Sequence, residues 1–309
     1  KIMSHIYNRV ALIGLGLIAS SMAHAMRRGN LAGQIVGHSR SIDTQKKAIS
    51  LEIFDEVFGS AKEAVENADL VVLCVPVGAM GSVAKDISAY MKAGSTLTDV
   101  GSTKRAVIDS VSPHVREDVF FVPAHPVAGT EQSGPDAGFA ELFDNRWCLM
   151  TPGKVEDHNL NRIEKLKLLW TSIGANVELM DPDHHDLVLA VTSHAPHLIA
   201  YTMVGVADDL RRVTDSEVVK YSAAGFRDFT RIAASDPTMW RDVFLSNKDA
   251  TLEILGRFTE ELFALQRAIR TGDGDYLHEY FTRTRELRRG VVEAGQDTDA
   301  PDFGRFKGR

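Results

Sequence analysis

The sequence predicts an α/β domain of the doubly wound Rossmann type over residues 1–180, followed by an all-helical domain over residues 181–309. Three observations lead to this prediction. Short β-branched runs alternate with amphipathic segments in the first half, and a glycine-rich turn follows the first of these runs. After Asp181, helical periodicity replaces the strand-like runs. A chain of 309 residues is long enough for both domains to bury their own cores.

The predicted strands of the first domain are short apolar runs bounded by turn residues. They cover residues 10–13, 34–37, 70–75, 95–98, 119–122 and 147–150, and a helix over 157–172 precedes a last strand over 176–180. In the second domain, Asp181 and Pro182 are typical of a helix start. A long amphipathic helix is expected over 239–270, and Gly272 ends it.

The composition argues against several classes of protein. A net charge of −7 and a pI near 5.9 disfavour a nucleic-acid binder, which usually carries a basic face. No apolar run is expected to reach the roughly 20 residues that span a bilayer, so no membrane partner is predicted. Cys74 and Cys148 lack metal-type spacing and predict reduced thiols in the cytoplasm. No metal is expected, because no Glu or Cys completes a zinc pattern with His184, His185, His194 and His197.

The first predicted strand leads into a turn typical of dinucleotide-binding domains, with Gly14, Gly16 and Ala19 in a GxGxxA pattern. The first Gly permits a tight turn, the second lets a pyrophosphate approach the backbone, and Ala19 lets helix and strand pack closely. The helix N-terminus at Leu17 and Ile18 then receives the phosphate charge. Because the turn stands between a strand and a helix, a dinucleotide is favoured over a glycine turn without ligand.

The end of the second predicted strand bears on the choice of cofactor. NAD-binding domains usually place a carboxylate there to hold the ribose 2′-hydroxyl, whereas this chain has Ser39 and Arg40. Arg40 can pair with a 2′-phosphate that a carboxylate would repel. NADP is therefore predicted, and NAD is the alternative if Arg40 is only a solvated surface residue.

Candidate site residues follow other predicted strands at the edge where ligands of α/β sheets bind. Val75 and Pro76 end one strand and open a cleft. Ser102 follows the next strand after a glycine, and it can hydrogen-bond in that cleft or else cap the following helix. His125, held by Pro126, is placed for general-base work, although a lone histidine is as often structural.

Together with segments of the helical half, these motifs resemble the prephenate/arogenate (cyclohexadienyl) dehydrogenase family. The resemblance covers nearly the whole chain and rests on DVGSTK at 99–104, HPVAGTEQSG at 125–134, DPDHHD at 181–186, SHAPH at 193–197, and GFRDFTRIA at 225–233 with SDPTMW at 235–240. It implies an NAD(P)-dependent oxidative decarboxylation that yields 4-hydroxyphenylpyruvate or tyrosine. It does not decide between prephenate and arogenate, which differ only in a side-chain keto or amino group.

The resemblance also implies a role for each candidate residue. His125 would accept the proton of the ring C4 hydroxyl, and Ser102 would orient that hydroxyl. Arg231 would hold the ring carboxylate, with Arg227 four residues away on the same side if the segment is helical. The other substrate-binding candidates are His194 and His197 near the substrate's side chain, Thr130 and Glu131 at the pocket mouth, and Trp240 from its own or a partner subunit.

A homodimer is expected, because the apolar stripe from Val243 to Leu265 is longer than a small helical core needs and the resemblance implies paired helical domains. Two rival classes fit less well. A β-hydroxyacid dehydrogenase would place a catalytic lysine on an early helix of the second domain, and residues 183–210 contain no lysine. A redox-sensing, NADP-binding regulator would not need His125, Ser102 and Arg231 together.

Overall fold

The computed structural model describes residues 5–154, 156–209 and 215–294. The chain forms two compact units, Lys1–Leu252 and Glu253–Arg309. The first unit contains two sheets and all of the candidate site residues. The second unit contains most of α12 (Lys248–Thr271) and α13 (Gly274–Glu293). The candidate site can therefore be described within the first unit.

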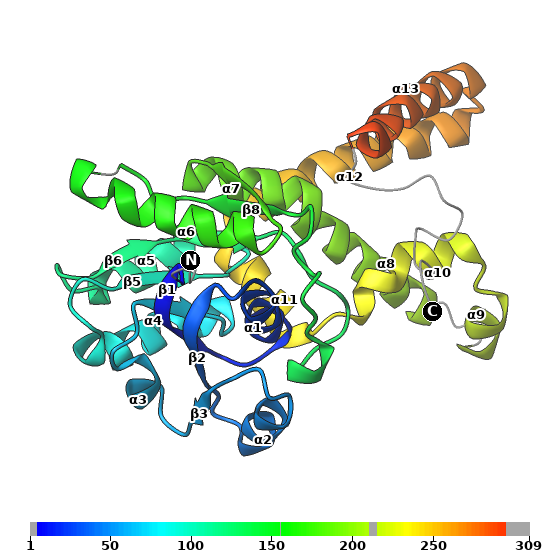
Figure 1. Cartoon of the computed structure of the whole chain (residues 1–309). Helices are drawn as coiled ribbons and strands as arrows, with labels where there is room; N and C mark the ends of the chain where they lie inside the picture. Colours follow the sequence, from blue (N-terminus) through cyan, green and yellow to red (C-terminus); the bar gives the residue numbers. More distant parts are fainter. Residues whose placement is uncertain (1–4, 155, 210–214, 295–309) are drawn as a thin grey trace. The chain divides into compact units, whose positions relative to one another are not determined.

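A six-stranded parallel sheet forms the nucleotide-type part of the chain (Figure 1). Its order, β3-β2-β1-β4-β5-β6, is that of the Rossmann dinucleotide-binding fold, as predicted. The strands are β1 (Tyr7–Ile13), β2 (Ala32–His38), β3 (Glu56–Phe58), β4 (Leu70–Leu73), β5 (Thr96–Asp99) and β6 (Phe120–Val122). The helices between them are α1 (Leu17–Gly29), α2 (Ile42–Ser50), α3 (Ala61–Val65), α4 (Val77–Ile87) and α5 (Arg105–Val111). The order reverses between β1 and β4, where ligands of such sheets bind.

Apolar side chains cover both faces of this sheet, because a parallel sheet is buried on both sides. Alternate residues of β1 enter two different cores: Val10 and Leu12 lie in one cluster with Trp170, and Ala11 and Ile13 lie in the other. The two cores hold β1 rigidly at the centre of the sheet. This fixes the position of the glycine turn that follows it.

His125 follows the carboxyl end of the parallel strand β6, as predicted, but it also belongs to a second sheet that the sequence did not predict. The order of this sheet is β7-β8-β9. The strand β7 (Ala124–Pro126) pairs antiparallel with β8 (Trp147–Met150), which pairs parallel with β9 (Asn176–Leu179). The predicted helix before β9 is confirmed as α6 (Leu160–Ser172). A strand of three residues is too short to show alternation, so β7 left no period in the sequence.

The described residues after Asp181 form helices and short connections and contain no strand, as predicted. The Asp181 carboxylate accepts hydrogen bonds from the backbone N–H groups of Asp183 (2.9 Å) and His184 (3.1 Å), and so caps α7. The helical elements are α7 (Pro182–Leu189), a π-helical turn (Ala190–His194), α8 (Ala195–Asp209), α9 (Asp215–Tyr221), α10 (Ala224–Thr230), a 3₁₀ turn (Arg231–Ala234), α11 (Pro237–Ser246), α12 and α13.

The prediction of a single helix over 239–270 is wrong. Asn247, with φ −114° and ψ 44°, separates α11 from α12. An amphipathic stripe can continue across a one-residue break, so periodicity alone does not detect it. The predicted helix end is confirmed, because Gly272 follows α12 with φ +70°.

One helical run is long and apolar enough to cross a membrane, by length and composition only. Within the described residues it is Pro182–Asp209, where α7, the π turn and α8 join over 28 residues. Its most apolar window has a mean hydropathy of 1.4, and 28% of that window is buried. The prediction that no apolar run reaches this length is therefore wrong.

Candidate active site

The turn between β1 and α1 has the shape that a pyrophosphate requires. Gly14 has φ +98°, and a Cβ at this position would lie 2.9 Å from the backbone of Cys74. A Cβ on Gly16 would meet nothing within 4 Å, so the backbone there is open to a ligand. No described side chain caps α1 at Leu17 and Ile18, and its first turn has no acidic residue. These residues fit the phosphates of a dinucleotide.

Val75 and Pro76 adjoin this turn at the end of β4. The Val75 side chain lies 2.9 Å from the position that a Cβ on Gly14 would take, and Pro76 is the N-cap residue of α4. The first turn of α4 contains no acidic residue and no side-chain cap among the described residues. The N-terminus of α4 therefore adds positive polarity at the ligand-binding edge of the sheet.

Ser39 and Arg40 follow β2. Ser39 Oγ accepts a hydrogen bond from the backbone N–H of Ser41 (3.3 Å), and the Gln45 side chain donates to the Ser39 carbonyl (2.6 Å). Arg40 is exposed, and its guanidinium has no hydrogen bond or ion pair within the described part of the chain. The loop is thus ordered by its own contacts, while the Arg40 charge is available to a ligand.

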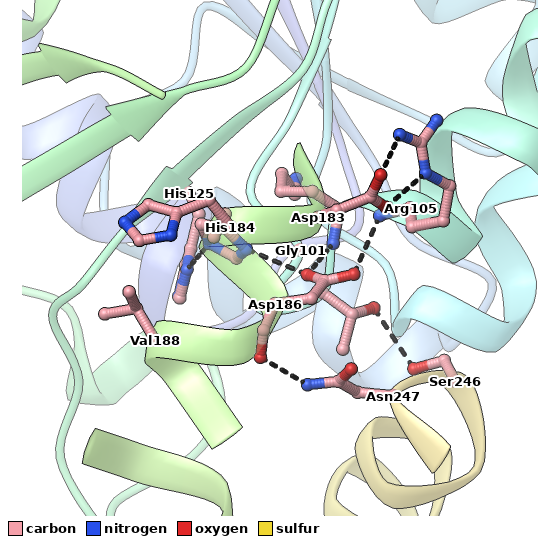
Figure 2. A network of polar contacts seen from close by, with 12 residues as sticks. Gly101, Arg105, His125, Asp183, His184, Asp186, Val188, Ser246 and Asn247 are labelled. Atoms are coloured by element: carbon pink, nitrogen blue, oxygen red, sulfur yellow. Dashed lines mark hydrogen bonds and ion pairs between the residues drawn. The ribbon is translucent and has the colours of Figure 1, made fainter. Parts of the chain in front are cut away.

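His125 is the first member of a buried chain of hydrogen bonds in the region shown in Figure 2. Its Nδ1 lies 2.8 Å from Nε2 of His185, whose Nδ1 lies 2.8 Å from Oδ1 of Asp186. His125 is 6% exposed and His185 is fully buried, so water does not compete for these contacts. Burial, and then the neighbouring His185, hold the pKa of His125 well below its usual value. His125 is therefore neutral at pH 7, which is the form that can accept a proton.

Asp186 joins α7 to the loop that follows β5. Its Oδ1 accepts a hydrogen bond from the backbone N–H of Lys104 (2.7 Å), and its Oδ2 accepts one from Arg105 (3.0 Å) at the start of α5 (Figure 2). The Arg105 guanidinium also donates to both carboxylate oxygens of Asp183, at 2.7 and 2.9 Å. The Asp186 carbonyl accepts a hydrogen bond from the side chain of Asn247 (2.8 Å). Asp186 thus connects α7 to the start of α5 and to Asn247.

A fully buried ion pair supports the strand that carries His125. The Lys104 ammonium contacts the Asp99 carboxylate and donates to the Ala124 carbonyl (2.6 Å). Asp99 also accepts hydrogen bonds from the backbone N–H groups of Ala124 (3.2 Å) and Gly101 (2.8 Å). Burial lowers the pKa of Lys104, and the Asp99 charge opposes that shift. These contacts tie β7 to the end of β5.

His194, His197 and Trp240 form an aromatic cluster beside this network. The His197 and Trp240 rings stack with their centroids 3.6 Å apart, and the His194 ring meets Trp240 edge-on at 6.1 Å. Asn247 Nδ2 lies 3.0 Å from Nδ1 of His194. Burial lowers the pKa of His194 to about 4, and it also lowers the pKa of His197. His194 Nε2 and Trp240 Nε1 are buried and have no hydrogen-bond partner among the described residues.

Trp240 is buried within its own chain, against the rings of His194 and His197. Its indole forms one wall of the aromatic cluster.

Arg231 lies at the exposed side of the cluster. Its Nη1 is 2.8 Å from Oε2 of Glu131, and the two side chains are 42% and 35% exposed. After burial, the Arg231 charge is among the causes that lower the pKa of His197. Thr130 accepts a hydrogen bond from the backbone N–H of Gln132 (3.1 Å) and lines an open pocket beside the loop. Arg231 and Glu131 thus form a partly exposed ion pair, in which a ligand carboxylate can replace Glu131 as the partner of Arg231.

Ser102 and Arg227 have different positions relative to these groups. Ser102 is half-buried and follows Gly101, where a Cβ would lie 2.9 Å from Val77 of α4. Ser102 therefore lies beside the N-terminal end of α4, and its backbone lies next to the His194 ring. Arg227 is exposed on α10 and pairs with its neighbour Asp228 at 3.5 Å, so the structure does not bring it to the aromatic cluster.

The sequence reasoning assigned no role to His185, Asp186, Asn247 or Lys104. The first two were part of a family-like segment, DPDHHD, and Lys104 ended another, DVGSTK. The concentration of polar residues in these two segments was a usable signal, because a buried hydrogen-bond network needs polar side chains on segments that meet in the fold. No local pattern marked Asn247, whose partners lie 53 and 61 residues away in the sequence.

The fold and the site together define a dehydrogenase that uses a nicotinamide dinucleotide. Two family models match the chain: "Prephenate dehydrogenase, nucleotide-binding domain" over residues 22–179, and "Prephenate dehydrogenase, dimerization domain" over residues 181–283. The chain is 40% identical over 284 residues to a cyclohexadienyl dehydrogenase of Zymomonas mobilis, which covers 92% of this chain and 96% of that protein. It is 32% identical to a prephenate dehydrogenase of Bacillus subtilis, covering 94% of this chain and 77% of that protein.

A solved structure agrees with these matches. The crystal structure of prephenate dehydrogenase from A. aeolicus in complex with hydroxyphenyl propionate and NAD+ has a TM-score of 0.84, at 32% identity, and covers 94% of this chain and 100% of that one. The chain therefore belongs to the prephenate dehydrogenase family, whose members act in tyrosine biosynthesis. It is a cyclohexadienyl/prephenate dehydrogenase with a nicotinamide cofactor.

Proposed function

We propose that this enzyme oxidises and decarboxylates prephenate, arogenate or both, with His125 as the base and NADP+ as the preferred cofactor. The observation that carries the proposal is the neutral, buried His125 at the head of a hydrogen-bonded chain that ends at Asp186. Ser102 and Arg231 complete the assignment, one beside the cofactor-binding edge and the other at the exposed side.

The proton chemistry follows from the form in which His125 is held. A neutral imidazole can accept the proton of the hydroxyl on the ring carbon that is oxidised. When bound, the nicotinamide supplies the hydride acceptor for that carbon. The hydroxyl becomes a carbonyl, which receives the electron pair released when the ring carboxylate leaves as CO2. Protonated His125 then returns the proton to the phenolate oxygen, and the ring is aromatic.

Substrate binding needs a cation for the ring carboxylate, and we assign this role to Arg231. Because Arg231 is paired with Glu131 in the free chain, a bound carboxylate must share or replace that contact. His194 and His197 are assigned to the polar groups of the substrate's side chain. Thr130 and Glu131 line the entrance.

The preference for NADP+ rests on the end of β2. Ser39 leaves the place of the usual carboxylate without a negative charge, and Arg40 has no competing partner among the described residues. A charge-assisted contact from Arg40 to a 2′-phosphate contributes about 1.5–3 kcal/mol. The related A. aeolicus structure contains NAD+, so NAD+ is the competing outcome.

We further propose a homodimer built on the helical part. Large apolar side chains of the stripe remain exposed in the single chain, among them Leu252, Leu262 and Phe263. Two helices alone cannot bury such side chains, and a second copy of the chain can. The match to a family model described as a dimerization domain supports the same assembly.

We propose the cytoplasm as the location of the enzyme. The apolar run Pro182–Asp209 holds His185, Asp186 and His194 in buried hydrogen bonds, which favours a helix of a folded protein over a membrane span. Cys74 and Cys148 are free thiols, in keeping with a reducing compartment.

The test is the absorbance of reduced cofactor when the protein is mixed with prephenate or arogenate and with NADP+ or NAD+. Turnover of at least one substrate is expected, with a higher kcat/KM for NADP+. A lack of reduced cofactor in all four mixtures would overturn the proposed reaction. A higher kcat/KM for NAD+ would overturn only the cofactor preference.

A further inference from the structure

We propose that Asp186 is a positioning residue that sets two active-site histidines in opposite hydrogen-bonding forms. Through His185 it makes His125 an acceptor toward the substrate. Through Asn247 it makes His194 a donor. The consequence for turnover rests on the proposed role of His125, whereas the assignment of the forms rests only on the hydrogen bonds of the free chain.

The first arm starts at the Asp186 carboxylate. Both of its oxygens accept hydrogen bonds from backbone N–H groups, those of Lys104 (2.7 Å) and Arg105 (3.0 Å). An ionised carboxylate can only accept, so Nδ1 of His185, at 2.8 Å, must donate. Nε2 of a neutral His185 is then an acceptor, and Nδ1 of His125, at 2.8 Å, must donate to it. Neutral His125 therefore keeps its lone pair on Nε2.

The second arm starts at the Asp186 carbonyl. A carbonyl oxygen only accepts, so the Asn247 atom at 2.8 Å is the amide nitrogen, which carries two hydrogens. The same nitrogen lies 3.0 Å from Nδ1 of His194, which must accept. The pKa of His194 is lowered to about 4 by burial, so the ring is neutral at pH 7 and its hydrogen is on Nε2. That Nε2 is buried and has no partner among the described residues.

The two arms leave one free acceptor, on His125, and one free donor, on His194. When His125 takes the proton of the substrate hydroxyl, its Nδ1–H is already bonded to His185. The new positive charge is then stabilised along the chain by the Asp186 carboxylate without any rearrangement of protons. His194 Nε2–H lies near the Ser102 backbone but makes no hydrogen bond of normal geometry within the described part of the chain, so it can bond to a substrate oxygen.

The first experiment measures the forms directly. Nitrogen-15 NMR of the ¹⁵N-histidine-labelled protein distinguishes ring nitrogens that carry a hydrogen from those that do not, and spectra of His125→Asn and His194→Asn assign the two rings. At pH 7 we expect the hydrogen on Nδ1 in His125 and on Nε2 in His194. The opposite form of either ring would overturn the proposal, whatever substrate the enzyme turns over.

A substitution of Asn247 tests the second arm. In Asn247→Asp a carboxylate replaces the amide and cannot donate to His194 Nδ1. We expect the His194 hydrogen to move to Nδ1, while His125 keeps its form. Asn247→Leu is the second variant if the aspartate does not fold, and it should leave a mixture of the two His194 forms. An unchanged His194 spectrum in a folded variant would contradict the role of Asn247.

Kinetics test the first arm. His185→Gln keeps an acceptor for His125 and a donor for Asp186, so kcat should stay within about tenfold of the wild type. His185→Phe removes both, and kcat should fall roughly 10²–10⁴-fold with both KM values little changed. The matched control is His184→Phe, because His184 is exposed on the same helix and should tolerate the change. Equal rates for His185→Gln and His185→Phe would overturn the arm.

The pH profile separates this role from a purely structural one. Asp186→Asn removes the negative charge that stabilises protonated His125, so the plateau rate should fall and the acid limb of kcat/KM should move to lower pH. A lower plateau with an unmoved limb would mean that Asp186 only supports the fold. If the wild type turns over neither prephenate nor arogenate while the NMR forms are as expected, the proposed function fails and the assignment of the forms stands.

Discussion

Replacing Lys104 with Met should destabilise the protein far more than the loss of a surface charge. The variant keeps the length of the apolar stem but leaves the Asp99 carboxylate fully buried, and among the described residues its remaining partners are the backbone N–H groups of Gly101 and Ala124. Removing one member of a buried ion pair costs about 3–5 kcal/mol, because the other charge remains without compensation. At about 2–4 °C per kcal/mol for domains of this size, the melting temperature should fall by roughly 6–20 °C.

Denaturant unfolding followed by tryptophan fluorescence provides the assay, since Trp170 is buried in the core of the same unit. The matched control is Lys47→Met, whose ion pair with Asp136 is mostly exposed at 3.5 Å and should contribute about 0–1 kcal/mol. Protein concentration must be held constant, because dimerisation alters apparent stability. A free energy of unfolding for Lys104→Met within about 1 kcal/mol of the control would refute the reasoning.

A double variant gives a second check. Without Lys104, the buried Asp99 carboxylate has lost the cation beside it. Adding Asp99→Asn removes the uncompensated charge, so the double variant should recover part of the lost free energy of unfolding at pH 7.

Four further predictions concern catalysis, binding and assembly. His125→Asn should lower kcat roughly 10²–10⁴-fold. Because the pKa of His125 is lowered, kcat/KM of the wild type should fall only below pH 6.5, and a midpoint above that pH would contradict the role of His125 as the base. Arg231→Ala should raise the substrate KM about ten- to a hundredfold. A rise in the cofactor KM alone would mean that Arg231 does not bind the substrate. Arg40→Ala should weaken NADP+ binding about ten- to a hundredfold and leave NAD+ almost unchanged, as measured by kcat/KM for each. The wild type should have the light-scattering mass of two chains and Phe263→Glu that of one; a single-chain mass for the wild type would refute the dimer.

Much of the nucleotide-binding fold was predictable because its signals are local. A glycine at positive φ, such as Gly14, and an alternation of short apolar runs are both determined by nearby residues. The same holds for the Asp181 cap and for Gly272 at the end of α12. In the helical half, the long match around Arg231 identified the family without any knowledge of its contacts.

The missing parts depend on contacts between distant segments. His125 pairs with His185 across 60 residues, and Asn247 meets His194 across 53. No spacing rule links such positions, because the fold alone brings them together. For the same reason the break at Asn247 was invisible: its backbone departs from the helix where its side chain bonds to α7 and the π turn.

The bonds between Asp186 and the start of α5 also limit how far this protein is modular. Composition changes near residue 180, yet Asp186 supplies the acceptors for the N–H groups of Lys104 and Arg105 on the other side of that boundary. A fragment ending at residue 180 would leave these two backbone N–H groups without the Asp186 acceptor and would expose the side chain of Lys104 to water. A foreign helical half grafted at residue 180 should therefore succeed only if it brings its own acceptor to this helix end. The nucleotide-binding half and the helical half of this chain are therefore joined through the Asp186 carboxylate.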